Sequence, residues 1–362
     1  MQTGPLAEIL GRPSARVSLT PPMSTSEPSA LVEPLEAVRT PSGLLLRGTQ
    51  LMLDPRGRSP LGFLSSARLG RSSLPERVVA TGPTLVLIEV ATPKLLSKSA
   101  PLPAQAGKPF ALGPLALTLH HAGCVLGSAW LRCEQEGKVV VWGADLGGSG
   151  TRAPRTAEPR EQPRCDTLIL RAVHGHPRYV FPPRDELFER LEEFVQRTLA
   201  DGLTPVVLAA PLGGAQEAAK FLGDRGHKLR LHSSIHRNAL AYEKLGVGFQ
   251  DLEPFESAAA PGEVVIIPYS ARVGRRGPIG AHRAVLLSGR AVEEGIGERA
   301  AVDLALPLSD HAGFDELVEI AQRSGAKRVL TVDGFATELA QELRTLGMDA
   351  YALGAERQLE LF

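Results

Sequence analysis

Short apolar segments dominate the first half of the chain and alternate with turn residues. Runs of this length, bounded by Gly, Pro or charged residues, are typical of β-strands. Strands are predicted at residues 43–46, 51–53, 84–88, 115–119, 129–133 and 138–142. Glu136-Gly137 separates the last two and predicts a hairpin turn. The first half is therefore expected to be rich in β-structure.

After Cys165 the pattern changes to strands that alternate with helices. Residues 184–200 place Leu187, Leu191 and Val195 on one face of an amphipathic helix. Further helices are predicted at residues 215–222, 315–324 and 336–346, and strands at 167–170, 205–208, 263–267, 284–287 and 328–332. Such alternation is typical of a parallel sheet, so the fold class is α/β.

Composition narrows the class of protein only modestly. Lys+Arg 40 balance Asp+Glu 40, so a global attraction to nucleic acid is excluded while a local basic patch is not. Residues 1–35, rich in Pro, Ser and Thr, predict a disordered tail, and residues 1–40 lack the pattern of a signal peptide. No apolar run has the length of a membrane span. Three cysteines without a CxxC pair fit a reducing cytoplasm, where we expect the protein.

Four motifs carry a resemblance to a known family. Residues 122–129 (AGCVLGSA) resemble the A-G-H-x-L-G-S-A loop of β-CASP nucleases in the metallo-β-lactamase superfamily. Residues 306–317 (LPLSDHAGFDEL) resemble the P-L-S-D-H-A-D segment of bacterial DNA ligase-associated exonucleases. Residues 143–146 (GADL) and 288–290 (SGR) match two further segments in the family's order. The resemblance covers roughly residues 45–355. It implies an αββα metallo-β-lactamase fold with an inserted β-CASP α/β cap domain.

The resemblance also suggests a division of the chain into domains. The predicted parts are a tail at 1–35, a first metallo-β-lactamase part at 36–165, a β-CASP-like cap at 166–300, a C-terminal metallo-β-lactamase part at 301–354 and a clamp-binding-like tail at 355–362. Residues 213–217 (GGAQE) match the family's G-R-A-Q-E helix start and predict a tight strand-to-helix turn.

The family's chemistry implies two zinc ions that generate a hydroxide and hold a phosphodiester. Its first ligand cluster, H-x-H-x-D-H, follows a strand and an Asp-Pro pair. Here Asp54-Pro55 is followed by residues 64–71 (LSSARLGR), which contain no His or Asp. Arg68 and Arg71 stand in this stretch instead, and a guanidinium repels a divalent cation.

Most other ligand positions are also changed relative to the family. Cys124 stands where the loop histidine would be, Arg171 where the family has an acidic residue, and Asp333 where the last histidine would be. Asp145 matches the bridging aspartate and His311 the histidine that assists the leaving group. Because only these two remnants keep their type, no catalytic residue is assigned, and a protein without bound metal is expected.

A rewired metal site remains an alternative. Cys124, Asp145 and Asp333 can bind zinc or manganese together with His120 or His121. Adjacent residues of a strand point to opposite faces, so at most one of the two histidines takes part.

Simpler structural roles are open for the same residues. Asp145 is then expected to accept backbone hydrogen bonds, and His311 to cap the helix that follows it. Cys124 and Cys133 would be small buried apolar residues.

The arginines allow two interpretations. Arg68, Arg71 and Arg171 are candidates for a groove that binds phosphate without hydrolysing it. Alternatively, Arg171 fills the space of a metal and forms a salt bridge with Asp145 or Asp333. The basic stretch at residues 272–277 can contact a nucleic-acid backbone or simply be solvated.

The last five residues resemble a known docking peptide. QLELF matches the Q-L-x-L-F motif by which bacterial replication and repair proteins bind the β sliding clamp, with Gln358, Leu359, Leu361 and Phe362 as anchors. The alternative is a last strand that packs Leu359 and Leu361 onto the domain.

These features predict a catalytically inactive pseudo-nuclease that acts as a DNA repair or replication accessory docked on the sliding clamp. The resemblance implies DNA as a partner, together with an ATP-dependent DNA ligase or a helicase. Two alternatives remain open, an active metal-dependent DNA or RNA exonuclease with a rewired site and a pure protein scaffold.

Overall fold

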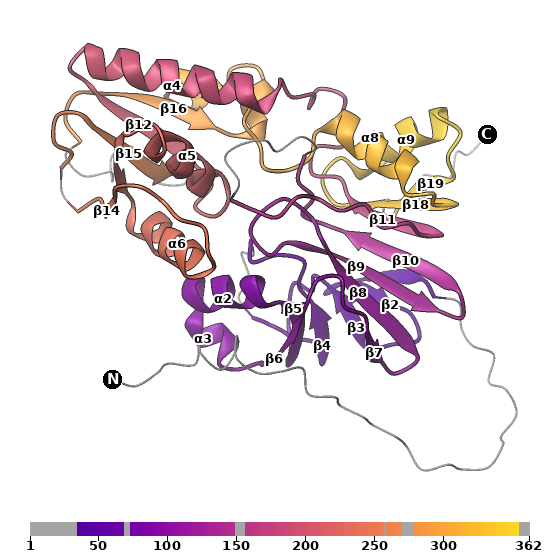
Figure 1. Cartoon of the computed structure of the whole chain (residues 1–362). Coiled ribbons are helices and arrows are strands. Elements are labelled where there is room, and N and C mark those ends of the chain that lie inside the picture. The colour runs from indigo at the N-terminus through magenta and orange to yellow at the C-terminus, as the bar shows by residue number, and fades with distance from the viewer. Residues whose placement is uncertain (1–34, 69–72, 149–155, 257, 270–278, 355–362) are drawn as a thin grey trace, which may run out of the picture.

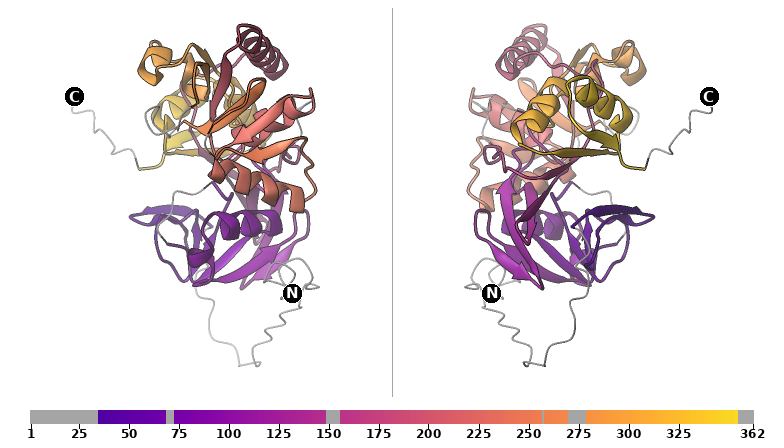
Figure 2. Two further views of the ribbon diagram at one scale, coloured as in Figure 1. Left: turned by 90° about the vertical axis from the view of Figure 1, so that its left-hand side faces the viewer. Right: turned by 90° about the vertical axis from the view of Figure 1, so that its right-hand side faces the viewer.

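The computed structural model describes residues 35–68, 73–148, 156–256, 258–269 and 279–354. Two sheets pack face to face, and a third sheet with its own helices lies at one end of this sandwich (Figures 1 and 2). Residues 1–34 of the predicted N-terminal tail, the predicted C-terminal tail, Arg71 and the basic stretch at 272–277 fall outside the described residues, whereas Leu35 is described and buried.

The first sheet consists of short strands from the N-terminal third. Its order is β1 (Ala37–Thr40), β2 (Gly43–Leu46), β3 (Leu51–Leu53), β4 (Leu61–Phe63), β5 (Arg77–Thr81) and β6 (Ala100–Ala104). The first three strands pair antiparallel and the remaining pairs are parallel. Strand β3 is buried along its whole length, and Asp54 follows it directly.

The second sheet joins distant parts of the chain. Its order is β19 (Ala350–Ala352), β18 (Arg328–Val332), β11 (Thr167–Arg171), β10 (Lys138–Gly143), β9 (Ala129–Gln135), β8 (Leu115–His121) and β7 (Phe110–Leu112). The predicted hairpin between β9 and β10 is confirmed, with positive φ at both Glu136 and Gly137 as a two-residue turn of this hand requires. Because β11 pairs in parallel with both β10 and β18, residues that follow these three strands share one edge of the sheet.

Helices cover the outer faces of the two sheets. Apolar side chains such as Leu53, Phe63 and Ile169 fill the space between the sheets. Helices α8 (Phe314–Arg323) and α9 (Ala336–Thr345) pack on the second sheet. Helices α2 (Gly82–Ala91) and α3 (Pro93–Leu96) pack on the first. The predicted helix–sheet–sheet–helix order is therefore confirmed (Figure 1).

Helix α2 corrects the predicted strand at residues 84–88. The Thr81 hydroxyl accepts a hydrogen bond from Thr84 N at 3.2 Å, and Pro83 stands in the first turn, so the N-terminus carries two helix signals. The run is apolar on all sides because α2 lies between the first sheet and α6 (Ser233–Lys244). Periodicity alone does not distinguish such a buried helix from a buried strand.

The third sheet is entirely parallel, as the strand–helix alternation predicts. Its order is β14 (Leu252–Pro254), β13 (Lys228–Leu231), β15 (Glu263–Pro268), β12 (Thr204–Ala209), β16 (His282–Leu287) and β17 (Leu304–Leu306). Helices α4 (Arg184–Ala200), α5 (Gly214–Gly223) and α6 pack against one face. The other face meets partly buried residues of α7 (Ile296–Ala300), beyond the 3₁₀ turn η2 (Gly289–Val292). This unit is the inserted cap of the predicted fold.

The chain enters the third sheet after β11 and leaves it after β17. Strand β11 therefore belongs to the second sheet, although it lies after the predicted domain boundary at residue 165. Strand β17 belongs to the third sheet, although it lies after the predicted boundary at residue 300. The boundaries themselves stay predictions.

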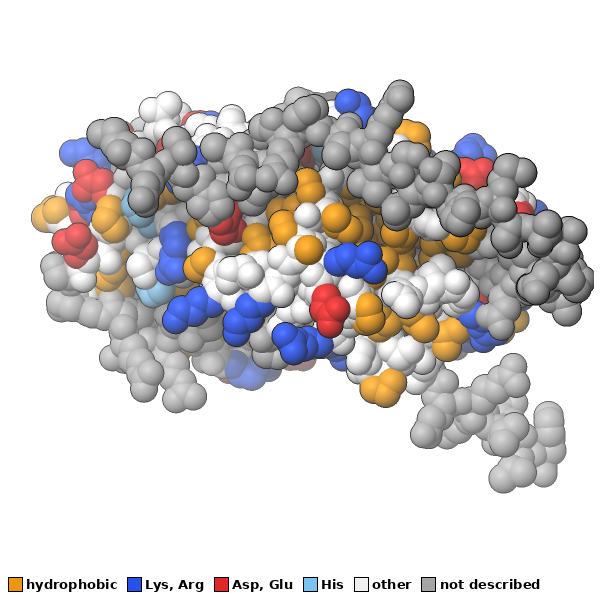
Figure 3. All heavy atoms as spheres, turned by 90° about the horizontal axis from the view of Figure 1, so that it is seen from below, with side chains coloured by type: hydrophobic (Ala, Val, Ile, Leu, Met, Phe, Trp, Pro, Cys, Tyr) orange, Lys and Arg blue, Asp and Glu red, His pale blue; other side chains and the backbone are white. Residues whose placement is uncertain are grey.

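Within the described residues, no helix is long and apolar enough to span a membrane. Seen from below, the molecule shows several basic side chains gathered toward one side and apolar side chains across the middle (Figure 3). A formal net charge of +0 is thus compatible with local differences in charge on one face.

Candidate functional site

The loop at residues 122–129 connects β8 to β9 and presents Cys124. Gly123 and Gly127 both have positive φ, and a Cβ at Gly127 would lie 2.7 Å from Pro83 Cβ. The Ser128 hydroxyl accepts hydrogen bonds from the backbone N of Cys124 at 3.1 Å and of Val125 at 3.3 Å. The family-like glycines and serine therefore still shape this loop, although its metal-binding residue is replaced.

Asp145 follows β10 and is almost completely buried. Its carboxylate accepts hydrogen bonds from Ser66 Oγ and, at 2.9 Å, from Arg171 Nη1, and it lies 3.5 Å from His311 Nε2. Burial alone would raise the pKa of Asp145, but the contacts with His311, Arg171 and Ser66 hold it well below its usual range. The carboxylate is thus held by side chains, in place of the backbone donors expected from the sequence.

Arg171, at the end of β11, lies among three carboxylates. Its guanidinium is 2.9 Å from Asp145, 3.6 Å from Asp54 and 3.6 Å from Asp333. It also lies over the Trp142 ring, 5.7 Å from the ring centroid. Burial lowers the pKa of Arg171, but the three carboxylates raise it above its ordinary value. The salt bridge predicted for Arg171 is confirmed, with both of the suggested partners.

Asp54 links Arg171 to the neighbouring backbone and to Trp142. Its carboxylate accepts hydrogen bonds at 2.9 Å from Ser65 N and from the Trp142 indole Nε1. In the sequence, the Asp54-Pro55 pair only marks the segment that precedes the expected ligand cluster, and no role is predicted for Asp54. Its position directly after a buried strand is the feature that could have indicated a place in the site.

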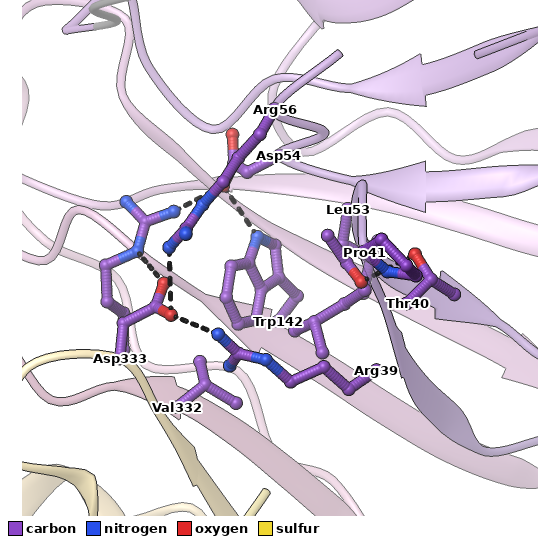
Figure 4. Close-up of a pocket in the computed structure, with 12 residues that line it drawn as sticks. Arg39, Thr40, Pro41, Leu53, Asp54, Arg56, Trp142, Val332 and Asp333 are labelled. Carbon is purple, nitrogen blue, oxygen red and sulfur yellow. Dashed lines mark hydrogen bonds and ion pairs between the residues drawn. The ribbon is translucent and has the colours of Figure 1, made fainter. Parts of the chain in front are cut away.

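Asp333 lies at the open side of the centre. Arg39 Nη2 and Arg56 Nη2 each donate to Asp333 Oδ1 at 3.0 Å, as Figure 4 shows. Burial raises the pKa of Asp333, but Arg39, Arg56 and Arg171 lower it below the ordinary value. Arg39 and Arg56 were not singled out from the sequence, because nothing local links them to Asp333.

Arg68 forms a second guanidinium centre, against the cap. It pairs with Asp310, with Nη1 at 2.7 Å from Oδ1, and its Nη2 donates to the Leu212 carbonyl oxygen at 2.7 Å. Nη1 also lies 3.0 Å from His311 Nδ1 and 3.9 Å from Cys124 Sγ. Burial lowers the pKa of Arg68, but Asp310 raises it well above its ordinary value.

The cap makes this close approach possible through Gly213. This residue has a φ of +92°, and a Cβ there would collide with Asp310 Oδ2 and lie 2.6 Å from Arg68 Nη2. The predicted tight turn before α5 is therefore confirmed, and its tightness brings the cap onto Arg68.

His311 does not cap the helix that follows it, contrary to the expectation from the sequence. The N-cap of α8 is Gly313, whose backbone N donates to Glu316 Oε2 at 2.9 Å. The imidazole lies between Asp145 and Asp310, with Nδ1 3.1 Å from Asp310 Oδ1. Burial lowers the pKa of His311, but Cys124 and the two carboxylates raise it well above its ordinary value. His311 is thus held as an imidazolium.

Cys124, Asp310 and His311 bring three potential ligand atoms within 4.8 Å of one another. The Arg68 guanidinium contacts all three residues, so a permanent positive charge lies against this set. A divalent cation would also need a neutral imidazole and a thiolate, whereas His311 favours its charged form and burial raises the pKa of the Cys124 thiol. The donor set therefore does not fit a metal ion.

Of the histidines proposed for a rewired site, His120 hydrogen-bonds another residue, whereas His121 Nδ1 makes no hydrogen bond within the described residues. His120 Nδ1 lies 2.8 Å from Glu161, and His121 Nδ1 lies 3.9 Å from Glu158. Cys124 and Cys133 are buried, as expected for small apolar residues.

Several predicted site residues cannot be placed. Arg71, Gln358, Leu359, Leu361 and Phe362 lie outside the described residues. Their suggested roles stay predictions.

The layers and the cap define the class of fold. It is the αββα metallo-β-lactamase fold with an inserted β-CASP α/β cap domain, and the guanidinium groups of Arg68 and Arg171 lie among the carboxylates between its layers and cap.

Named relatives agree with this class, although no protein-family model matches the chain. A "Probable DNA ligase" of Opitutus terrae is 36% identical over 250 residues, which are 68% of this chain and 24% of the relative. An "RNase J-like protein" of Methanocaldococcus jannaschii is 30% identical over 115 residues, 31% of this chain and 27% of the relative. "Ribonuclease TTHA0252" of Thermus thermophilus is 25% identical over 288 residues, 64% and 65% of the two chains. The matches therefore span about a quarter of the first two relatives and 65% of the third. These relatives point to the β-CASP nuclease superfamily.

Proposed function

We propose that this protein is a β-CASP nuclease-like protein without hydrolytic activity, which serves as a DNA repair or replication accessory docked on the β sliding clamp. The proposal of inactivity rests on one observation. Each of the buried or half-buried carboxylates at the centre, on Asp54, Asp145, Asp310 and Asp333, lies within ion-pair distance of Arg68 or Arg171.

The hydrolytic chemistry of the superfamily depends on metal ions, so carboxylates that are already paired with arginine argue against hydrolysis. Hydrolysis of a phosphodiester at neutral pH needs a metal-bound water whose pKa has been lowered far enough to provide hydroxide. An arginine side chain neither binds water in that way nor accepts a proton, because its guanidinium group is already protonated throughout the pH range in which proteins are folded. Arg68 and Arg171 therefore supply positive charge to the centre without supplying a nucleophile.

The names of the relatives support a role with nucleic acid. One relative is named a probable DNA ligase, and the segment similar to this chain makes up 24% of its length. A nuclease-like segment within one chain of that name supports a partnership between this protein and a DNA ligase. A helicase remains a further candidate partner.

Docking on the clamp rests on the motif Gln358-Leu359-Glu360-Leu361-Phe362. A glutamine and large apolar side chains in a peptide can fill an apolar pocket on a partner. Such a contact would hold the protein near replicating or repaired DNA.

A nuclease assay tests the absence of activity. Purified full-length protein is incubated with end-labelled single- and double-stranded DNA and with RNA, in the presence of Mg²⁺, Mn²⁺ or Zn²⁺. We expect no digestion above that of an Asp145→Ala variant prepared in parallel. Metal-dependent digestion that this variant loses would contradict the proposal.

A pull-down with purified sliding clamp tests the docking. We expect the full chain to be retained and a chain ending at residue 357 to be lost. A Glu360→Ala variant is the matched control, because this position is variable in the motif and should leave retention unchanged. Equal retention of the truncated and full chains would contradict the docking.

A second candidate function is a metal-dependent exonuclease with a rewired site. The observation in its favour is the approach of Cys124, Asp310 and His311 to within 4.8 Å. Its distinguishing result is manganese-dependent digestion that is abolished by both Cys124→Ala and His311→Ala.

The third alternative, a scaffold without nucleic-acid contact, differs in its response to salt. Contacts with phosphates release counterions, so the affinity for DNA falls steeply as salt concentration rises. The proposed accessory shows such binding, whereas a pure scaffold binds DNA at no salt concentration.

A further inference from the structure

A small pocket opens beside Asp333, where the two sheets meet. Its volume is about 40 Å³, and its polar lining comes mainly from Arg39, Arg56, Arg171, Asp54 and Asp333. Arg39 belongs to β1 and Arg171 to β11, while Arg56 and Asp333 follow β3 and β18. Figure 4 shows Arg39 and Arg56 reaching Asp333 from different segments of the chain. Three guanidinium groups from separate parts of the chain therefore converge on one space.

The hydrogen-bonding groups of this pocket are not balanced. A guanidinium carries five N–H donors, and Arg39 and Arg56 share a single oxygen of Asp333 as acceptor. Arg171 Nε is buried and makes no hydrogen bond within the described residues, although it lies within ion-pair distance of Asp333 Oδ2, at 3.6 Å. Donors thus exceed acceptors at the pocket, and an anion with several oxygens would correct the excess.

The charges are equal in number, with three guanidinium groups against the carboxylates of Asp54, Asp145 and Asp333, but they are unevenly placed. Arg171 is already paired with Asp145 and Asp54, so Arg39 and Arg56 face mainly the one carboxylate of Asp333. The Arg56 side chain is 67% exposed and that of Arg39 is 39% exposed, so both can turn toward a ligand at little cost. Asp333 orients them before the ligand arrives.

We propose that this pocket binds the terminal phosphate of a nucleic-acid strand. This inference rests on the proposed role as a DNA accessory and names the part of the DNA that is recognised. A phosphomonoester carries a charge of about −2 and three acceptor oxygens, which suits forked guanidinium donors from several directions. A peptide carboxylate has one charge and two oxygens, like the Asp333 side chain that already binds these arginines, so it would satisfy fewer of the remaining donors.

The size of the pocket also favours a strand end. A pocket of about 40 Å³ accommodates a small group such as a terminal phosphate. The site further differs from the groove expected from the sequence, because it uses Arg39 and Arg56 with Arg171. Arg68 is not among its lining residues.

The test compares strand ends in the presence of a chelator. Fluorescence anisotropy measures the affinity of the full chain for one labelled single-stranded DNA sequence with a 5′-phosphate, with a 3′-phosphate, or with hydroxyl groups at both ends. We expect one phosphorylated strand to bind about tenfold more tightly than the hydroxyl strand, as charge-assisted hydrogen bonds provide. Which phosphate is preferred identifies the end that the pocket recognises. Equal affinity for all three strands would overturn the proposal.

Variants locate the effect. Arg39→Gln combined with Arg56→Gln should abolish the preference for the phosphorylated strand, and these exposed positions should leave the fold intact. Arg197→Gln is the matched control, because Arg197 is 78% exposed on α4 and forms an ion pair of similar type with Glu193. A preference that survives in the double variant would show that the phosphate binds elsewhere and would overturn the assignment.

Inorganic phosphate distinguishes a strand end from the free ion. If it raises the unfolding temperature as much as the phosphorylated strand does at equal concentration, the nucleic-acid assignment is wrong. The test is independent of the proposed inactivity, because the chelator suppresses any metal-dependent hydrolysis. A positive nuclease assay would overturn the proposed function and leave the end preference standing, whereas equal binding of all strands would leave the clamp pull-down unaffected.

Discussion

The two arginine centres of this protein differ in how they are enclosed. Arg68 lies beneath the cap and contacts the Leu212 carbonyl oxygen, Asp310, His311 and Cys124. Arg171 lies between the two sheets of the sandwich, and a pocket opens beside it. Both guanidinium groups neutralise carboxylates in a region where the superfamily's fold implies metal ions.

The difference shows that two arginine–carboxylate centres of one protein can take different roles. At Arg68 the cap covers the ion pair, so the guanidinium charge joins the cap to the sandwich. At Arg171 the pairing extends outward through Asp333 to the exposed side chains of Arg39 and Arg56. The closed centre is thus expected to govern stability, and the open centre to govern binding.

The largest effect is expected from Arg68→Met. The substitution leaves Asp310 buried without its main partner, which should reduce the free energy of unfolding by about 3–5 kcal/mol. Denaturant unfolding of the two proteins measures the difference. Arg197→Met, at the exposed pair with Glu193, is the control and should change the value by less than about 1 kcal/mol. A similar small change for Arg68→Met would contradict the assignment of the closed centre.

Acid should weaken the closed centre through His174. Burial and the nearby His311 charge lower the pKa of His174 from 6.5 to about 4, and the ring lies 6.1 Å from that of His311. The unfolded chain therefore takes up the proton first, and stability is lost as the pH falls from 6.5 to 4, by up to about 3 kcal/mol.

His311 acts with the opposite sign. The pKa of His311 is raised in the folded state, so its contribution to the free energy of unfolding is fully present below pH 6.5. This contribution is lost as the pH rises through the pKa that His311 has in the folded protein. Urea unfolding between pH 4 and 8 measures the two limbs. His174→Asn, which keeps a donor for the Ala312 carbonyl oxygen, should flatten the acid limb only. An unchanged acid limb in this variant would show that His174 does not titrate as described.

Gly213→Ala should loosen the contact between the cap and the closed centre. A φ of +92° and the approach to Asp310 and Arg68 leave no space for a Cβ, so a cost of about 1–3 kcal/mol is expected. Gly214→Ala is the matched control, because nothing lies within 4 Å of a Cβ at that helical position. Thermal unfolding should show a lower unfolding temperature for Gly213→Ala than for Gly214→Ala. Equal unfolding temperatures would contradict a close contact between Gly213 and the closed centre.

The smallest effect on stability is expected from Arg56→Gln at the open centre. The Arg56 side chain is 67% exposed, and Asp333 keeps Arg39 and Arg171 as partners. The free energy of unfolding should change by less than about 1 kcal/mol in chemical denaturation. A loss comparable with that of Arg68→Met would abolish the distinction between the two centres.

Local patterns in the sequence predict much of the fold and less of the site. The amphipathic spacing at residues 184–200 and the Glu136-Gly137 turn lead directly to α4 and the hairpin. The prediction of a strand at residues 84–88 is wrong, because these residues belong to a helix that is buried on all sides. Such a helix has no polar face, so its sequence lacks the alternation of apolar and polar residues that identifies a helix.

Contacts within the site also divide into those that local sequence patterns predict and those that they do not. The pairing of Arg171 with Asp145 is predictable, because both follow neighbouring strands that the motifs identify. The partners Arg68–Asp310 and Arg39–Asp333 are 242 and 294 residues apart, so nothing local links them. For the same reason, His311 looks like a helix cap in sequence although it faces a centre built from distant segments.

The metal content of the protein tests the central claim most directly. Full-length protein is incubated with excess Zn²⁺ or Mn²⁺, freed of unbound metal by gel filtration and measured by inductively coupled plasma mass spectrometry. The account predicts far less than one metal ion per chain, because the guanidinium groups of Arg68 and Arg171 already neutralise the carboxylates. Two zinc ions per chain would contradict it.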